Sequence, residues 1–199
     1  MYKGKMRFET LLFLALACCT VCWVKADNLI DDYARELGDK TAEEINQIAF
    51  EERDRQISTF ARESLDAHNQ YRRKHGAPAL FVCPRLNKVA QAYAETIAKK
   101  DTLVHSNNGF GENLFASTGR EPNGREPVTA FYNEIQKYDF NSPGFSMETG
   151  HFTQVVWKAT KMVGVGKAKS SRGTTYVVYN YYPPGNYEGQ FAANVLPAQ

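Results

Sequence analysis

The stretch Gly150-His151-Phe152-Thr153-Gln154-Val155-Val156-Trp157-Lys158-Ala159-Thr160 combines a titratable imidazole, a hydroxyl, an amide and a large aromatic ring with a short apolar segment. In a helix, positions i, i+3 and i+4 share a face, so His151, Gln154 and Val155 lie on one side. Phe152 and Val156 then lie on another side. The pattern predicts a helix that presents polar chemistry on one side and packs into a core with the other. A buried helix with one hydrogen-bonded core histidine is the alternative, because a single histidine is a weak functional signal.

The sequence around this stretch predicts helices first and an antiparallel pair of strands last. Apolar residues recur at helical spacing over residues 61–75, 84–97 and 127–138. After residue 160 the period changes to two over residues 163–168 and 174–182, which a hairpin connection joins. The segment that begins at Phe110 is a further candidate for extended structure. This order favours an α+β fold over a repeated βαβ unit.

The first 26 residues have the pattern of a secretory signal peptide. Lys3, Lys5 and Arg7 precede an apolar run over residues 11–24, which is shorter than the roughly 20 residues that a membrane-spanning helix needs. Val24-Lys25-Ala26 then offers a small-residue cleavage site. An uncleaved signal anchor is the alternative. We therefore expect a secreted, extracellular protein without a membrane span once the signal is removed.

Residues 27–60 form an acidic extension ahead of the main domain, which we place at residues 61–199. The extension carries four basic and ten acidic residues, a net charge of −6, whereas residues 61–199 carry +5. A capping-box pattern at residues 41–44 and apolar residues at helical spacing predict short amphipathic helices in the extension. Two roles stay open for it: a solvated extension, or a pro-segment or lid on the basic domain. The basic residues of the domain are scattered rather than gathered in a stripe, which argues against nucleic-acid binding.

Cysteine usage argues against a disulfide-stabilised domain. Cys18, Cys19 and Cys22 belong to the signal segment, so the secreted chain retains Cys83 alone. Apolar neighbours favour a small buried side chain at this position. A reactive thiol or an intermolecular bridge is the alternative.

Three further polar residues stand out beside His151. His105 lies in a polar loop, Glu112 lies between a glycine and an asparagine, and Glu134 lies on the third predicted helix. Two histidines and two glutamates suit a zinc or copper site, or an acid–base pair, although their spacing alone does not choose between these. The sequence has no His-Glu-x-x-His run and no Gly-x-Ser-x-Gly elbow, which disfavours zincin-type proteases and α/β-hydrolases.

Four segments of the chain resemble the CAP superfamily, which comprises cysteine-rich secretory proteins, insect venom antigens and plant pathogenesis-related proteins. Residues 150–160 fit the family's first signature along its full length, and Tyr181-Tyr182-Pro183-Pro184-Gly185-Asn186 fits the end of the second. Residues 67–76 resemble its opening helix and residues 111–114 its Gly-Glu-Asn box. The resemblance covers about residues 61–197 and is closest to the Golgi-associated pathogenesis-related branch.

The resemblance implies a three-layer α-β-α sandwich with a central antiparallel sheet. It also implies a surface cleft floored by His105, Glu112, Glu134 and His151, in which His105 and His151 hold zinc or another divalent metal beside the carboxylates. The chain departs from the family at Tyr179, where the second signature normally has a cysteine, so the usual disulfide is absent.

Three functions are consistent with these observations. The preferred one is a non-enzymatic secreted binding module with a metal-capable cleft and a lipid, sterol or protein partner, acting as a monomer or weak dimer. The second is a hydrolase in which Glu112 or Glu134 activates a metal-bound water. The third is an immune or reproductive signalling protein with a vestigial cleft. Glu112 and Glu134 would have purely structural roles if they accept backbone N–H bonds or pair with an arginine, and His68 and His75 are expected to be structural or surface residues.

Overall fold

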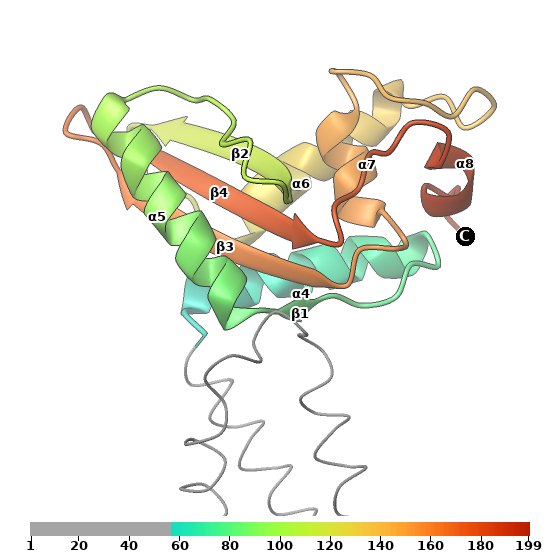
Figure 1. The fold of residues 1–199 in the computed structure, drawn as a ribbon, viewed down its shortest axis with the longest axis horizontal. Helices are drawn as coiled ribbons and strands as arrows, with labels where there is room; N and C mark the ends of the chain where they lie inside the picture. Colours follow the sequence, from blue (N-terminus) through green and yellow to red (C-terminus); the bar gives the residue numbers. More distant parts are fainter. Residues whose placement is uncertain (1–56) are drawn as a thin grey trace, which may run out of the picture. The chain divides into compact units, whose positions relative to one another are not determined.

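The computed structural model describes residues 57–199. The proposed signal peptide, 1–26, and almost all of the acidic extension, 27–60, lie outside the described residues. The described elements follow one another as α4 (Thr59–Lys74), β1 (Phe81–Val82), α5 (Pro84–Lys100), β2 (Gly111–Thr118), α6 (Arg125–Asn133), the 3₁₀ helix η1 (Glu134–Lys137), α7 (Gly150–Val156), β3 (Met162–Lys169), β4 (Thr174–Tyr182) and α8 (Phe191–Asn194) (Figure 1).

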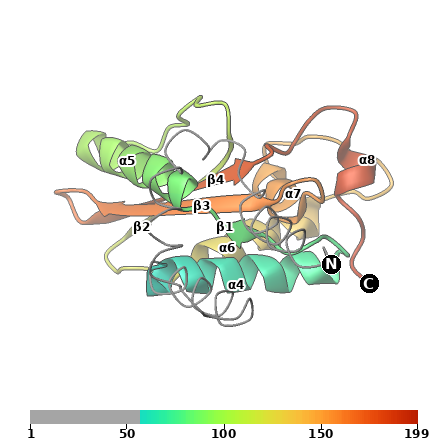
Figure 2. The same cartoon turned by 60° about the horizontal axis from the view of Figure 1, so that its bottom comes forward.

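A four-stranded sheet in the order β1-β3-β4-β2 forms the middle layer. The pairs β3–β4 and β2–β4 are antiparallel, and the short strand β1 joins β3 in parallel. Helix α5 covers one face of the sheet, and α4, α6 and α7 cover the other (Figures 1 and 2). This arrangement confirms the expected α+β class and the three-layer sandwich, and adds a parallel edge strand that the sequence did not indicate.

Strand β4 separates the two cores by the alternation of its side chains. Val177, Tyr179 and Tyr181 belong to the larger core, beneath α4, α6 and α7. Tyr176 and Val178 belong to the smaller core, beneath α5. Because successive side chains of a strand point to opposite faces, a continuous apolar strand is what a sheet covered on both faces requires.

The four helices predicted within the main domain are confirmed, and the bounds of the last two are corrected. The third helix begins at Arg125 rather than at Pro127, and it changes to a 3₁₀ turn at Glu134. The fourth helix ends at Val156 instead of extending to residue 160.

The early end of α7 has a physical cause in α4. The buried guanidinium of Arg72 donates hydrogen bonds to the backbone oxygens of Val155 (2.9 Å), Trp157 (2.8 Å) and Thr160 (2.9 Å). The last carbonyls of a helix have no intrahelical donor, and the guanidinium supplies donors at this end of α7. Burial lowers the pKa of Arg72 to about 10, so the group remains a cation at neutral pH. The positive charge is favourable at a helix C-terminus.

Cys83 is 5% exposed and precedes the first residue of α5, which agrees with the small buried side chain expected there.

Candidate functional site

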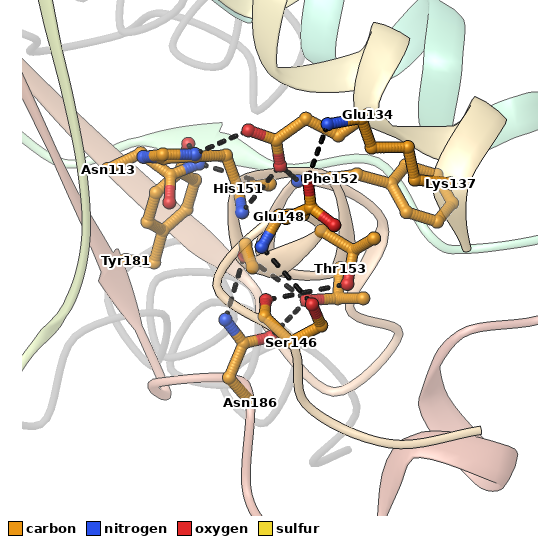
Figure 3. Close-up of polar contacts among 12 residues, drawn as sticks. Asn113, Glu134, Lys137, Ser146, Glu148, His151, Phe152, Thr153, Tyr181 and Asn186 are labelled. Carbon is orange, nitrogen blue, oxygen red and sulfur yellow. Dashed lines mark hydrogen bonds and ion pairs between the residues drawn. The ribbon is translucent and has the colours of Figure 1, made fainter. Parts of the chain in front are cut away.

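His151, in the first turn of α7, is held by Glu134 at the start of η1 (Figure 3). The Nδ1 atom of His151 lies 2.7 Å from Oε1 of Glu134. The other carboxylate oxygen accepts the backbone N–H groups of His151 (3.0 Å) and Phe152 (3.1 Å). One carboxylate therefore orients the imidazole and also satisfies two N–H groups at the positive end of the helix.

Two further contacts fix the position of His151. The ring of Phe131 stacks on the imidazole, with ring centroids 4.9 Å apart and an interplanar angle of 12°. The side-chain amide of Asn113 donates to the backbone oxygen of His151 at 3.1 Å. The side chain of His151 remains 33% exposed, so a ligand from solvent can reach it.

His105 forms a second histidine–glutamate pair, with Glu112 of β2. The Nδ1 atom of His105 lies 2.8 Å from Oε1 of Glu112. The same carboxylate accepts the backbone N–H (2.9 Å) and the hydroxyl (2.5 Å) of Ser106, and the amide of Asn180 lies 3.4 Å away. The Glu112 side chain is only 6% exposed, whereas that of His105 is 56% exposed. The carboxylate is thus a buried anchor and the imidazole is presented to solvent.

The sequence Gly111-Glu112-Asn113 at the start of β2 links the two pairs. Glu112 holds His105, and Asn113, which points to the opposite face of the strand, holds the backbone of His151. Gly111 allows α7 to approach, since a Cβ at this position would lie 2.3 Å from the Gln154 side-chain oxygen. The Gly-Glu-Asn box therefore brings a loop residue and a helix residue to one end of the same strand.

The two pairs have the same chemical arrangement. An ionised carboxylate can only accept, so Nδ1 of each histidine carries the proton and Nε2 of the neutral ring carries a lone pair. Within residues 57–199, neither Nε2 atom has a hydrogen-bond partner. Histidines that bind metals usually donate their other ring N–H to a carboxylate in this way. Each imidazole therefore has the chemistry of a single metal ligand, with a carboxylate behind it.

The carboxylate oxygens of Glu112 and Glu134 already accept hydrogen bonds from groups of the protein. Each oxygen of Glu134 and of Glu112 accepts at least one hydrogen bond. The described part of the chain contains no group of three or more His, Cys, Asp or Glu side chains that could hold a metal ion. Two protein ligands would leave the remaining coordination positions to water or to a bound molecule.

Gln154 does not share the exposed side of α7 with His151, contrary to the helical-face prediction. It is 2% exposed and lies between two glycines. Its amide donates to the Thr160 hydroxyl at 3.2 Å and accepts from the backbone N–H of Gly185 at 2.9 Å. Because α7 has only seven residues and is covered on most sides, a face predicted from the period is not a face open to solvent.

A buried polar chain that sequence reasoning missed connects α4 to the site. Nδ1 of His68 lies 2.7 Å from the backbone oxygen of Ser64, and its Nε2 lies 2.8 Å from the Tyr181 hydroxyl. The Tyr181 oxygen accepts from Asn113 at 3.3 Å, and Asn113 holds His151 (Figure 3). Burial lowers the pKa of His68 to about 4, so its ring stays neutral. The sequence signal for this series of hydrogen bonds was Asn113, as part of the Gly-Glu-Asn box.

His75 is also a structural residue. Its Nδ1 lies 2.6 Å from the backbone oxygen of Leu196, and its Nε2 lies 3.0 Å from the Tyr132 hydroxyl. Burial lowers the pKa of His75 as well. His68 and His75, which the sequence did not assign to the site, are therefore both buried and hydrogen-bonded within the fold.

Comparison with known proteins gives a consistent family assignment. The sequence model described as "CAP: Cysteine-rich secretory protein family" matches residues 65–181. The chain is 48% identical over 144 residues to Golgi-associated plant pathogenesis-related protein 1 of Homo sapiens, covering 69% of this chain and 93% of that protein. It is 40% identical over 140 residues to Protein PRY2 of Saccharomyces cerevisiae, covering 69% of this chain but only 41% of that protein.

Solved structures show the same fold. The crystal structure of NaASP2 with Zn²⁺ has a TM-score of 0.57 to this chain at 20% identity, and the match covers 72% of this chain and 88% of that one. At this identity the likeness concerns the fold alone. None of the helices within residues 57–199 has the length and apolar character required to cross a membrane.

Proposed function

The chain belongs to the cysteine-rich secretory protein (CAP) family, and on that premise we propose that it is a secreted, non-enzymatic binding module. Its two histidine–glutamate pairs hold a divalent metal, most suitably zinc, through Nε2 of His105 and of His151. A lipid, a sterol or a protein partner binds at the surface of the domain. Neutral imidazoles are good zinc ligands, and the open coordination positions would accept water or a donor atom of the partner.

The observation that supports this proposal most strongly is the matched tethering of the two rings. Each Nδ1 is bound to a carboxylate, at 2.8 Å for His105 and 2.7 Å for His151, which leaves each Nε2 lone pair available to a ligand. Such a carboxylate fixes the tautomer and raises the basicity of the ligand nitrogen. The structurally similar protein NaASP2 has a crystal structure with Zn²⁺, which adds weight to the choice of metal.

The same contacts argue against assigning a hydrolytic role to the glutamates. A general base must be able to accept the proton of a reacting water. Glu134 would first have to release the backbone N–H groups of His151 and Phe152, and Glu112 would have to release Ser106. Both carboxylates are better suited to positioning the histidines.

Isothermal titration calorimetry with zinc tests the proposal. The full chain is expected to bind one zinc ion, and the double variant His105→Ala/His151→Ala is expected to lose that binding while keeping its circular dichroism spectrum. Glu148→Gln is the control, because this carboxylate is 67% exposed, pairs with Lys137 and does not bind either imidazole. Equal zinc affinity in the wild type and the double variant would show that the metal assignment is wrong.

A further inference from the structure

The outer edge of β3 is only partly covered by a strand. Strand β1 pairs with Met162 and Val163 and then ends. The backbone N–H of Cys83 still donates to the Val163 oxygen at 3.0 Å, after which the chain turns into α5. Beyond this point, no other strand of the described chain pairs with the outer side of β3.

Beyond the end of β1, side chains of α5 form hydrogen bonds with the outer edge of β3. The side-chain oxygen of Asn87 accepts the backbone N–H of Val165 at 2.8 Å. The oxygen of Gln91 accepts the N–H of Lys167 at 2.9 Å, and the Gln91 nitrogen donates to the Lys167 oxygen at 3.1 Å. These are the hydrogen bonds that a neighbouring strand would otherwise supply.

The geometry of helix and strand makes this substitution regular. Residues four apart in a helix are separated by about 6 Å along its axis, and residues two apart in a strand by about 6.7 Å. The spacing between Asn87 and Gln91 along α5 is therefore almost the same as the spacing between Val165 and Lys167 along β3. A short side chain such as asparagine reaches the strand only if the helix lies very close to it.

Two glycines provide this close approach. A Cβ at Gly164 would lie 2.2 Å from the backbone carbon of Leu86, and a Cβ at Gly166 would lie 2.2 Å from the backbone nitrogen of Gln91. Real Cβ atoms do not approach backbone atoms this closely, so the helix can lie on β3 only because both positions lack a side chain.

We propose that Asn87 and Gln91 act as a side-chain edge strand, which closes β3 against pairing with β3 of a second copy of this chain. An open strand edge is a template for pairing with another chain. A cavity of about 430 Å³ lies at this edge, lined by residues that include Asn87, Gln91 and Val165, so solvent reaches it. Without the two amides, the same N–H and C=O groups in two copies would meet and pair.

The test compares the full chain with the double variant Asn87→Leu/Gln91→Met, which keeps side-chain size but removes the amides. Analytical ultracentrifugation is expected to show a shift from the wild-type mass to dimers or larger species. Hydrogen exchange at Val165 and Lys167 is expected to become at least tenfold faster in dilute protein and to slow again as the concentration rises. An unchanged mass together with unchanged exchange at both amides would overturn the proposal.

Single variants keep the test decisive if the double variant does not fold. Asn87→Leu removes the acceptor for Val165, whereas Asn87→Asp keeps an oxygen in the same place. Exchange at Val165 should accelerate in the first and stay slow in the second. Lys88→Met is the matched surface control, because Lys88 lines the same cavity and lies next to Asn87 on α5. If Asn87→Asp or Lys88→Met self-associates to the same extent as Asn87→Leu, the proposal is wrong. The exposed edge would then result from lost packing or a changed charge, and not from the lost hydrogen bond to Val165.

Discussion

Replacing Glu134 with glutamine separates the two roles of this carboxylate. In the native protein one oxygen faces Nδ1 of His151, and the other accepts the backbone N–H groups of His151 and Phe152. A glutamine has a single acceptor oxygen, and two N–H donors compete for it against one imidazole. We expect the oxygen to remain with the backbone and the amide NH₂ to face Nδ1.

The consequence is a change of tautomer rather than a loss of fold. Facing a donor, Nδ1 must become the acceptor, so the proton of the neutral ring moves to Nε2, where the metal should bind. Loss of a carboxylate behind a ligand histidine typically weakens metal binding by 10- to 100-fold, which corresponds to about 1.4–2.7 kcal/mol. Exchanging charge-assisted hydrogen bonds for neutral ones should lower the free energy of unfolding by about 1–3 kcal/mol, a fraction of the stability of a typical domain.

Two measurements check this reasoning. Zinc calorimetry should give the weaker affinity, with Glu148→Gln at the wild-type value. Nitrogen-15 NMR of the imidazole should show the proton on Nδ1 in the wild type and on Nε2 in Glu134→Gln. If the variant keeps the Nδ1 proton, or binds zinc within twofold of the wild type, the positioning role of Glu134 is refuted.

Three further predictions concern stability. Arg72→Met removes the guanidinium donors to the buried carbonyls of Val155, Trp157 and Thr160, so urea denaturation should show a loss of more than about 4 kcal/mol, and an unchanged midpoint would contradict the capping role. The folded-state pKa of His68 is about 4, below its ordinary value of 6.5, so the unfolded chain binds a proton that the folded protein excludes. His68 should therefore contribute a loss of about 3 kcal/mol of stability as the pH falls from 6.5 to 4, and His68→Gln should show a smaller loss than the wild type by about this amount when the two are compared by denaturation across that range. Gly166→Ala should lower the melting temperature by several degrees because its Cβ would overlap the backbone of α5, whereas Gly144→Ala, which has open space around it, should not; equal melting temperatures would show that α5 can move away from β3.

Much of the secondary structure could be read from periodicity. Residues 174–182 were predicted as a strand and form β4, although this strand is apolar on both faces. Apolar spacing predicted α4 and α5, because burial of one face selects for the helical period. Strand β1, with two residues, and α8, with four, are too short to leave a period. They exist because neighbouring elements satisfy their backbone groups.

The candidate site could be named by resemblance, but its pairing could not be read from spacing. The sequence placed His105 and Glu112 seven residues apart, and His151 seventeen residues from Glu134, with no indication of which carboxylate each ring would meet. Strand β2 decides this, because one side chain of its Gly-Glu-Asn box holds a loop residue and the next holds a helix residue.

The sequence of residues 150–160 by itself determined that a short helix carries a histidine next to apolar anchors, and its signature identified the family. Only the tertiary structure decided where that helix ends and which of its polar side chains meets solvent. Arg72 and Gln154 illustrate the reason: the guanidinium caps α7 from α4, and the amide lies between two glycines from other segments. A period specifies which residues share a face of one element. What lies against that face depends on segments far away in the sequence. His68 and Tyr181, for example, are 113 residues apart and meet only when the layers pack.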